Sequence, residues 1–369
     1  MMEETIAKWV LLGLGFNGCE QLGPHSEPDN QDVCSLSVST PLPLLTLSTR
    51  TPTRPELKIS CTWDSLHITG ESLKDDVVLT TGRWKTVLAS SKLTKYNISE
   101  IKEVGCKMIL NTDSKVLLAT KDPQDKETMF VSEQELSMSG IPNFSTLEDG
   151  TLYALLKNKQ FHSCTISPLT NDAAAKETIS IGHQLLTSSI PIIKVSCGTD
   201  HVLLLSSIGS LFSMGLNSRG QLGQGDIETR TQPSLVAALD GLAIKDISCG
   251  HWHCLALSEI GDVYSWGWNQ HKQLGHSEST VTVPMPTLVE FEKEDVNIVC
   301  ISCGSKHSVA LSDRGVVYGW GWNGYGQLGR RKEETITYPK CIELLETLTP
   351  VYVYCKYWNT LVLCENRIV

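Results

Sequence analysis

The sequence contains neither an apolar run long enough to span a membrane nor a recognisable catalytic motif. The apolar run of residues 9–16 is too short to span a bilayer, and acidic rather than basic residues precede it, so we expect a buried strand there. Coiled-coil heptads and long helical patterns are absent, which argues against a helical architecture. There is also no nucleophile elbow, phosphate-binding loop or paired-carboxylate constellation. We therefore expect no enzyme, no catalytic residues and no cofactor.

Positive charge is scarce. The chain has 31 Lys and Arg against 41 Asp and Glu, a formal net charge of −10. Proteins that bind phosphate backbones generally present a basic face, so direct DNA binding is not expected. The one compact basic cluster, at residues 330–332, is followed at once by two glutamates and is interpreted as a solvated turn. Contact with a basic partner, such as a histone tail, stays open.

A secretion signal is missing too, so the 13 cysteines indicate a reducing compartment rather than a disulfide framework. Five of them recur at one slot in successive segments of the chain, which predicts a small buried side chain at a crowded position. These five are Cys61, Cys197, Cys249, Cys303 and Cys355.

What the sequence does contain is a segment of just over fifty residues repeated three times. The copies start near residues 195, 247 and 301 with Ser-Cys-Gly-x-x-His, and each ends in Gln-Leu-Gly. The recurring cysteines Cys197, Cys249 and Cys303 are offset by 52 and 54 residues, and other landmarks keep the same offsets. A fixed period of this length is typical of propellers and solenoids.

The two ends of the chain favour the propeller. Residues 15–23 match the second half of a repeat, and residues 355–363 match the first half. An open solenoid has no need of complementary halves at its termini, whereas a ring does, because one blade built from both ends hides two sheet edges.

The sequence therefore predicts an all-β, seven-bladed β-propeller closed by one blade shared between the N- and C-termini. The count comes from dividing 369 residues by a repeat of about 52. We expect a single propeller domain over residues 8–365. Residues 13–23 and 351–363 form the split blade, 193–350 form three regular blades, and 24–190 form degenerate blades with inserted loops at 37–55 and 121–150.

The repeat resembles that of the regulator of chromosome condensation family. The motifs that carry this resemblance are Ser-Cys-Gly-x-x-His, Gly-x-Val-Tyr-x-Trp-Gly and Asn-x-x-Gly-Gln-Leu-Gly, and residues 301–329 are close to a family consensus copy. The resemblance implies a seven-bladed propeller. Among family members the chain is most similar to a small, single-propeller, chromatin-associated protein that pairs with a JmjC-domain oxygenase of the lysine-demethylase type. That likeness implies a nuclear location, with the cytoplasm as a second compartment.

His201, His253 and His307 occupy the same position in successive repeats, a recurrence that suggests a metal site. Equivalent residues of neighbouring blades are too far apart to share one zinc ion, whose ligand bonds are about 2.0–2.3 Å long. We therefore predict no metal, and a hydrogen bond from each histidine across its own blade. Cys300-x-x-Cys303 lacks a second pair and His251-x-His253-Cys254 lacks a matching ligand pattern, so both are interpreted as structural.

The two Trp-Gly-Trp elements contribute Trp266, Trp268, Trp320 and Trp322, which we assign to packing between blades. The residues that differ between copies are more informative about function, because the framework does not dictate them. Mixed aromatic and charged residues on one rim are typical of a protein-binding surface, although ordinary variable loops are an equal alternative. The candidates are Thr199, Asp200, His251, Trp252, Ser305, Lys306, Tyr357 and Trp358.

Two functions compete. The first is a non-enzymatic scaffold that binds a protein partner on chromatin. The second, implied by the family's founding member, is a nucleotide-exchange factor for a Ran-like small GTPase. Asp200 matches an acidic residue of the founder's GTPase-facing rim, but positions 252, 306 and 358 are Trp, Lys and Trp, and the founder's basic N-terminal tail is absent. We favour the scaffold. A third possibility is an adaptor for ubiquitin ligation, but the sequence shows no appended domain that would support it.

Overall fold

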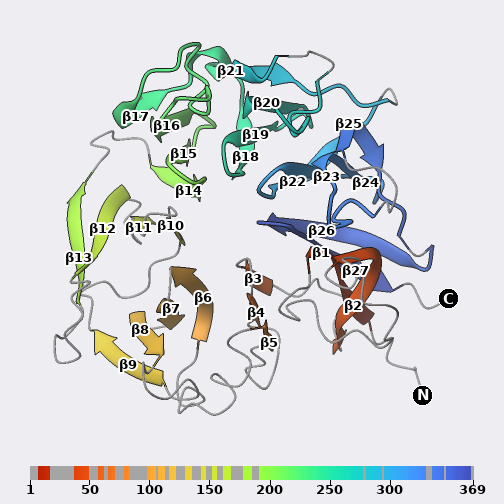
Figure 1. Ribbon diagram of the computed structural model, residues 1–369, viewed down its shortest axis with the longest axis horizontal. Helices are drawn as coiled ribbons and strands as arrows, with labels where there is room; N and C mark the ends of the chain where they lie inside the picture. The colour runs from red at the N-terminus through yellow and green to blue at the C-terminus, as the bar shows by residue number, and fades with distance from the viewer. Residues whose placement is uncertain are drawn as a thin grey trace.

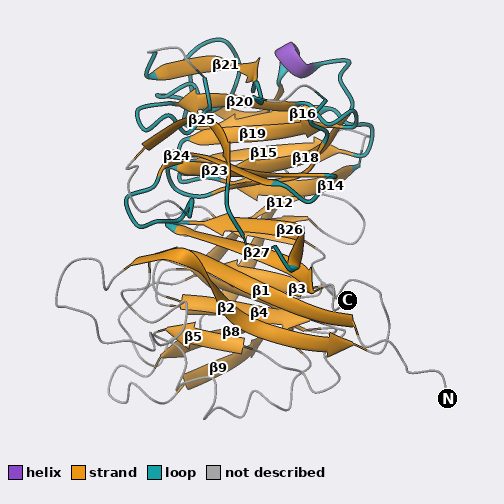
Figure 2. Cartoon of the chain, turned by 90° about the vertical axis from the view of Figure 1, so that its right-hand side faces the viewer, coloured by secondary structure: helices purple, strands orange, loops and turns teal. Residues whose placement is uncertain are grey.

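The computed structural model describes residues 191–366 apart from 277–279, 293–294, 330–334 and 345. Before residue 191 it describes strands only, with side chains at residues 9–14, Tyr153 and Phe161. These residues are almost all β-structure, and the one short helix among them is the 3-10 turn η3 (Ala237–Leu239), purple in Figure 2. No helix in the described part of the chain is long and apolar enough to cross a membrane.

The described strands form seven sheets arranged around a ring (Figure 1). This confirms the predicted all-β propeller. Each regular repeat makes one four-stranded antiparallel meander, with its strands in chain order. The strands of the three regular blades are β14 (Ile192–Cys197), β15 (His201–Ser206), β16 (Leu211–Gly215), β17 (Arg230–Leu235), β18 (Ile244–Cys249), β19 (His253–Ser258), β20 (Val263–Trp268), β21 (Thr282–Leu288), β22 (Ile298–Cys303), β23 (His307–Ser312), β24 (Val317–Trp322) and β25 (Thr335–Cys341).

Each strand suits its place in the blade. The second strands, β15, β19 and β23, are largely apolar and are buried at every position, because they lie inside the sheet with a neighbouring blade on each face. The fourth strands lie at the outer edge of each sheet and carry Pro233, Pro284, Pro286 and Pro339. Proline cannot donate a ladder hydrogen bond, so an edge strand is where it is tolerated.

A repeated hydrogen bond joins each regular blade to the next. The Cys249 N–H donates to Ser196 Oγ at 3.0 Å, the Cys303 N–H to Ser248 Oγ at 2.9 Å, and the Cys355 N–H to Ser302 Oγ at 2.7 Å. The serine and the cysteine of the Ser-Cys pair thus bond to different neighbours. The cysteines at this slot are buried, as predicted, at positions 197, 249, 303 and 355. The side chain of Cys61 lies outside the described residues.

The first tryptophan of each Trp-Gly-Trp element packs between blades, as predicted. Trp266 and Trp320 are fully buried. The Trp266 indole N–H donates to the Gln221 carbonyl of the preceding blade at 3.0 Å. Gly223 of that blade lies against the same indole, and a Cβ there would come within 2.9 Å of Trp266 Nε1.

The second tryptophan, Trp268 or Trp322, is only partly buried, although it too contacts an adjoining blade: the Arg219 guanidinium lies 5.3 Å from the centre of the Trp268 ring, and the Trp358 ring lies 5.1 Å from that of Trp322. Gly267 and Gly321 have φ values of 102° and 99°, and the pairing with the fourth strand shifts register next to each glycine. An extended strand would keep residues two apart on one face. The positive φ breaks that alternation and takes the second indole out of the blade.

Both ends of the chain form one sheet. Its order is β2 (Ser37–Thr49), β1 (Ala7–Phe16), β27 (Asn359–Asn366) and β26 (Leu348–Lys356). This confirms closure by a shared blade. The predicted buried strand at 9–16 is also confirmed over the residues whose side chains are described, since 9–14 are all buried. The expected loop at 37–55 is wrong for residues 37–49, because they form β2, an edge strand that accommodates Pro41 and Pro43.

The remaining three sheets lie within residues 57–184. Their strands are β3 (Leu57–Cys61), β4 (Ser65–Gly70), β5 (Leu79–Gly82), β6 (Ile98–Val104), β7 (Lys107–Thr112), β8 (Val116–Lys121), β9 (Met129–Gln134), β10 (Asn143–Thr146), β11 (Leu152–Leu155), β12 (Phe161–Ser167) and β13 (Thr178–Gln184). Strands β9 and β10 lie inside the stretch 121–150, where we expect inserted loops. The boundaries of one domain over residues 8–365 stay a prediction.

Candidate protein-binding rim

The predicted site residues lie in loops at one end of the blades. These loops join the first strand of a blade to the second, at 198–200, 250–252, 304–306 and 357–358. Main-chain hydrogen bonds tie neighbouring loops together, since the Thr199 N–H donates to the His251 carbonyl at 3.1 Å and the Ser305 N–H to the Tyr357 carbonyl at 2.6 Å. The eight candidates therefore come from one continuous row of loops.

A second set of variable residues, Arg219, His271 and Tyr325, comes from the Asn-x-x-Gly-Gln loops. A fixed glutamine holds each of them. The side-chain oxygens of Gln221, Gln273 and Gln327 accept from the N–H of Arg219 at 2.8 Å, of His271 at 2.9 Å and of Tyr325 at 3.0 Å. The motif thus fixes the loop backbone through its constant residues while the intervening side chain is left to vary.

Half-exposed side chains from both sets of loops contact one another and form a single group, which we call the aromatic rim. Trp252 and Trp268 lie edge to face with ring centroids 5.1 Å apart, as do Trp322 and Trp358. His251 joins these two pairs, at 5.5 Å from Trp252 and 6.1 Å from Trp358. The aromatic rim consists of Arg219, His251, Trp252, Trp268, His271, Lys306, Trp322, Tyr325, Tyr357 and Trp358.

Each pair of indoles lies beside a cation. The Arg219 guanidinium lies 3.9 Å from the centre of the Trp252 ring and 5.3 Å from that of Trp268. The Lys306 ammonium lies 5.6 Å from the Trp358 ring and 5.9 Å from the Trp322 ring. A cation over an indole face is attracted by about 0.5–1 kcal/mol when exposed. These contacts orient the indoles before any partner arrives.

Ser305 is buried, with 1% of its surface exposed, so it offers no surface to a partner. Its hydroxyl lies 3.0 Å from His251 Nε2. The His251 ring also lies 6.0 Å from the ring of Tyr357, which belongs to the blade beyond that of Ser305. Because the residue at position 305 is small, the rings of His251 and Tyr357 contact each other above it.

The carboxylate of Asp200 contacts side chains of the protein itself. Its carboxylate accepts from Gln221 Nε2 at 3.1 Å and from the Trp252 indole N–H at 3.3 Å, and it lies 3.5 Å from His201 Nδ1. Burial raises the pKa of Asp200, but its hydrogen bonds with His201, Gln221 and Trp252 outweigh burial and lower it. Asp200 thus holds Trp252 in place from the adjoining blade.

The sequence shows Arg219, His271 and Tyr325 as a second variable set in the Asn-x-x-Gly loops, but they were not among the predicted site residues. Trp268 and Trp322 carried no such signal, since they recur at one slot and look like framework. Their exposure depends on the turn of the backbone at the preceding glycine.

The rim loops carry a local charge opposite to that of the whole chain. Arg219, Arg230, Lys272, Lys306 and Lys356 lie in or next to the described loops, against Asp200, Asp226 and Glu228. These eight residues have a formal balance of +2, within a chain of net charge −10. An acidic protein surface is electrostatically complementary to such a face.

The repeated histidines bond between blades, which corrects the prediction of a bond within one blade. His201 Nε2 lies 3.1 Å from Cys254 Sγ, His253 Nε2 lies 3.0 Å from Ser308 Oγ, and His307 Nε2 lies 3.0 Å from Thr360 Oγ1. In each case the partner belongs to the next blade along the chain. The strand carrying the histidine is covered by that blade, so the ring reaches across rather than along its own sheet.

Burial sets the protonation of two of these histidines. Desolvation lowers the pKa of His253 and that of His307 to about 3, so both are neutral at physiological pH. Burial also opposes the charged form of His201. There the charge of Cys249 and the hydrogen bond with Asp200 outweigh it and raise the pKa to about 9.

The sequence matches the family described as regulator of chromosome condensation (RCC1) repeat at residues 209–257, 261–311 and 314–363, and a second description of the same repeat at 192–221, 244–273 and 298–327. It is similar to mouse RCC1 domain-containing protein 1, with 32% identity over 221 residues. That match covers 50% of this chain and 58% of the mouse protein, so the chain spans little more than half the length of this relative.

Two solved structures share the fold. Human WBSCR16 superposes with a TM-score of 0.73 at 17% identity, covering 98% of this chain and all of that one. Prp20p from Saccharomyces cerevisiae superposes with a TM-score of 0.70 at 16% identity, covering 96% of this chain and 91% of that one. The Prp20p structure was described together with the binding of that protein to Gsp1p and histones.

Proposed function

Because residues 192–363 are built of RCC1 repeats and fold as propeller blades, we propose that this protein is a non-enzymatic scaffold that binds a protein partner through its aromatic rim. The partner we propose is a JmjC-domain oxygenase of the demethylase type, bound at chromatin in the nucleus. The choice of partner rests on the likeness of the chain to a single-propeller, chromatin-associated member of the family.

The observation that carries the proposal is the composition of the aromatic rim. Tryptophan, tyrosine and arginine dominate the binding energy of protein interfaces, and the two aromatic residues cover much area while losing few rotamers. Here four tryptophans, two tyrosines and an arginine lie half-exposed in mutual contact. In a protein without a partner, such side chains would gain more from burial in the core.

The local positive charge favours an acidic surface on the partner. An acidic patch on the oxygenase would pair with Arg219, Lys306 and Lys356 around the aromatic side chains. A basic histone tail is less suited to this rim, although the overall charge of −10 leaves other faces suited to one. The binding of histones by Prp20p supports a histone as a second partner elsewhere on the molecule.

The alternative function is nucleotide exchange on a Ran-like GTPase, supported by the fold shared with Prp20p and the binding of that protein to Gsp1p. In this alternative, Asp200 would be the residue that contacts the GTPase. Its carboxylate already accepts hydrogen bonds from Gln221 and Trp252. Breaking them would offset part of the free energy gained by binding a GTPase. The scaffold is therefore the better-supported function.

A double substitution tests the scaffold. We expect Trp252→Ala/Trp358→Ala to fold normally, because both side chains are half-exposed, and to weaken binding of the oxygenase by at least about tenfold. The measurement is affinity purification with quantitative mass spectrometry, followed by calorimetry with the purified partner. Nuclease treatment of the lysate excludes a nucleic-acid bridge.

Ile260→Ala is the matched control. Ile260 is 78% exposed in the turn between β19 and β20, at the end of the blade away from the aromatic rim. The Ile260→Ala variant should bind the partner as strongly as the unmodified protein does. Equal recovery of the oxygenase with the control and the double variant would remove the scaffold proposal, whereas acceleration of GDP release from a Ran-like GTPase would establish the alternative.

A further inference from the structure

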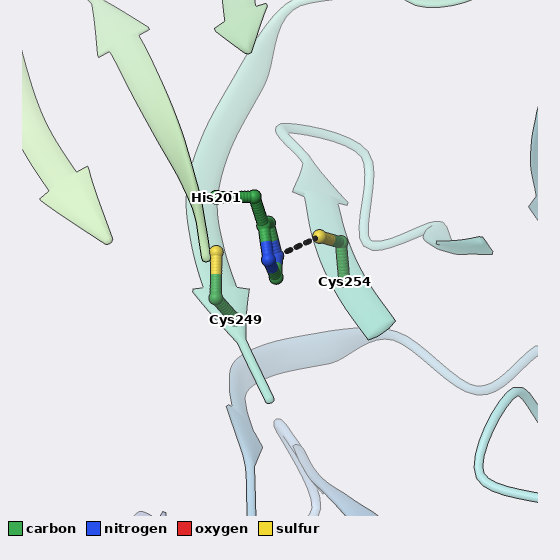
Figure 3. Close-up of side chains that lie close together, drawn as sticks. All are labelled: His201, Cys249 and Cys254. Carbon is green, nitrogen blue, oxygen red and sulfur yellow. Dashed lines mark hydrogen bonds between the residues drawn. The ribbon is translucent and has the colours of Figure 1, made fainter. Parts of the chain in front are cut away.

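Three metal-ligating side chains converge at the junction of the first two regular blades. His201 comes from β15, and Cys249 and Cys254 come from β18 and β19 of the next blade, where they are directly opposite partners. One ligand atom from each lies within 4.8 Å of the other two, and all three residues are buried. Figure 3 shows the imidazole ring between the two sulfur atoms.

The spacing suits three of the four positions around a tetrahedral zinc ion, the fourth being left for a water molecule. Zinc binds sulfur at about 2.3 Å and nitrogen at about 2.0–2.1 Å, so ligand atoms of one site lie about 3.5–3.8 Å apart. His201 Nε2 and Cys254 Sγ are 3.1 Å apart, and every pair of ligand atoms lies within 4.8 Å. Shifts of about an ångström would complete the coordination distances. Two thiolates and a neutral imidazole also balance the charge of a divalent cation in a buried site.

The surroundings orient the histidine as in zinc proteins. Metal-bound histidines commonly donate their other ring N–H to a carboxylate, which fixes the tautomer. Here the carboxylate of Asp200 lies 3.5 Å from His201 Nδ1. Asp200 is itself held by Gln221 and Trp252. His201 Nε2 lies 3.1 Å from Cys254 Sγ, on the other side of the ring from Nδ1.

The other junctions show that a thiol at position 254 is not needed for hydrogen bonding. Ser308 and Thr360 occupy the matching slot and bond to His253 and His307 at 3.0 Å. Like Cys254, which donates to the Gln221 carbonyl, Ser308 donates to the Gln273 carbonyl. Within the described residues, the first junction alone combines a histidine with two cysteines in this way.

We propose that His201 Nε2, Cys249 Sγ and Cys254 Sγ bind a single zinc ion that fastens two blades together. Both thiols lose their protons to solvent as the zinc–sulfur bonds form, and no electron is transferred. The ion enters during folding together with the water of its fourth position, because the three ligands are buried in the finished protein. The prediction of no metal weighed the three histidines, Cys300-x-x-Cys303 and His251-x-His253-Cys254, but did not combine His201 with Cys249 and Cys254. This proposal does not depend on the binding of a partner by the aromatic rim.

The test is the metal content of the full-length protein expressed in zinc-supplemented medium and purified under reducing conditions. We expect about one zinc per chain by plasma mass spectrometry, released when the protein unfolds. Cobalt in place of zinc should show a thiolate-to-cobalt charge-transfer band. Matched variants are Cys254→Ser and Cys254→Thr, which recreate the side chains found at the next two junctions and should therefore fold. Both should lose the zinc and the band.

A supporting variant is Asp200→Asn, which we expect to weaken zinc retention against a chelator by about 10–100-fold without abolishing it. The proposal is overturned if the wild-type protein holds no zinc after expression or refolding in its presence. It is equally overturned if the Cys254 variants, shown to be folded by their melting transitions, hold as much zinc as the wild type.

Discussion

Each repeated histidine covers the glycine three residues before it. A Cβ at Gly250 would lie 2.1 Å from His253 Cε1 and 2.5 Å from the Gly304 carbonyl oxygen, so no larger residue fits. The ring then reaches the next blade through Nε2. The Cys-Gly-x-x-His motif is thus a steric unit, and two of its histidines, His253 and His307, are neutral because burial lowers their pKa values.

We predict a loss of stability in mild acid from His253 and His307. The pKa of each falls from 6.5 in the unfolded chain to about 3 in the folded protein, so below pH 6.5 the unfolded state binds more protons. Their contribution is complete above pH 6.5 and is lost as the pH falls towards 3. At pH 5 the loss is about 2 kcal/mol for each histidine.

Urea unfolding followed by tryptophan fluorescence at pH 7 and pH 5 measures this loss. His253→Gln/His307→Gln should flatten the dependence on pH, because glutamine keeps a hydrogen bond but binds no proton. A free energy of unfolding that is the same at both pH values would contradict the assignment of neutral, buried histidines.

At the scale of the element, the Asn-x-x-Gly-Gln turn is built alike in three blades, with one exception. Its fourth residue has a positive φ in each copy, 71° at Gly220, 74° at Gly326 and 61° at Lys272. Only glycine adopts this conformation without strain, and another residue pays about 1–2 kcal/mol. The middle blade carries that strain at the loop that presents His271.

Lys272→Gly should therefore raise the free energy of unfolding by about 1 kcal/mol, because it relieves the strain at the cost of some flexibility in the unfolded chain. The reverse change, Gly326→Lys, should lower it by a similar amount. Urea unfolding at neutral pH compares the three proteins. A destabilised Lys272→Gly variant would show that contacts of the lysine side chain outweigh the backbone strain.

At the scale of the whole molecule, the shared blade joins the beginning of the chain to its end. One continuous core cluster contains Val10, Leu12 and Leu14 of β1 together with Leu255 and Trp320 of the regular blades. Loss of packing in β1 is therefore expected to weaken blades more than 200 positions away in sequence.

Leu14→Ala tests this coupling. Leu14 is fully buried, and removing a buried leucine costs about 2–5 kcal/mol. We expect one lowered melting transition, shared by backbone circular dichroism and by the fluorescence of the buried indoles in the regular blades. Ile208→Ala, at a residue 64% exposed, should change stability by less than about 0.5 kcal/mol. Separate transitions in the Leu14→Ala variant would contradict a ring that unfolds as one unit.

The sequence by itself determined the repeat, the propeller and the way its ends meet, because period, turn glycines and alternating strands are local properties. It also identified the loops of the rim, since variation inside a fixed motif is visible in a single chain. Only the tertiary structure decided which side chains meet across blades. Trp268 joins the rim through the backbone turn at Gly267, Ser305 lies beneath His251, and Cys254 faces a histidine 53 positions earlier. Contacts between blades depend on how the sheets pack in three dimensions, and no spacing along the chain encodes them.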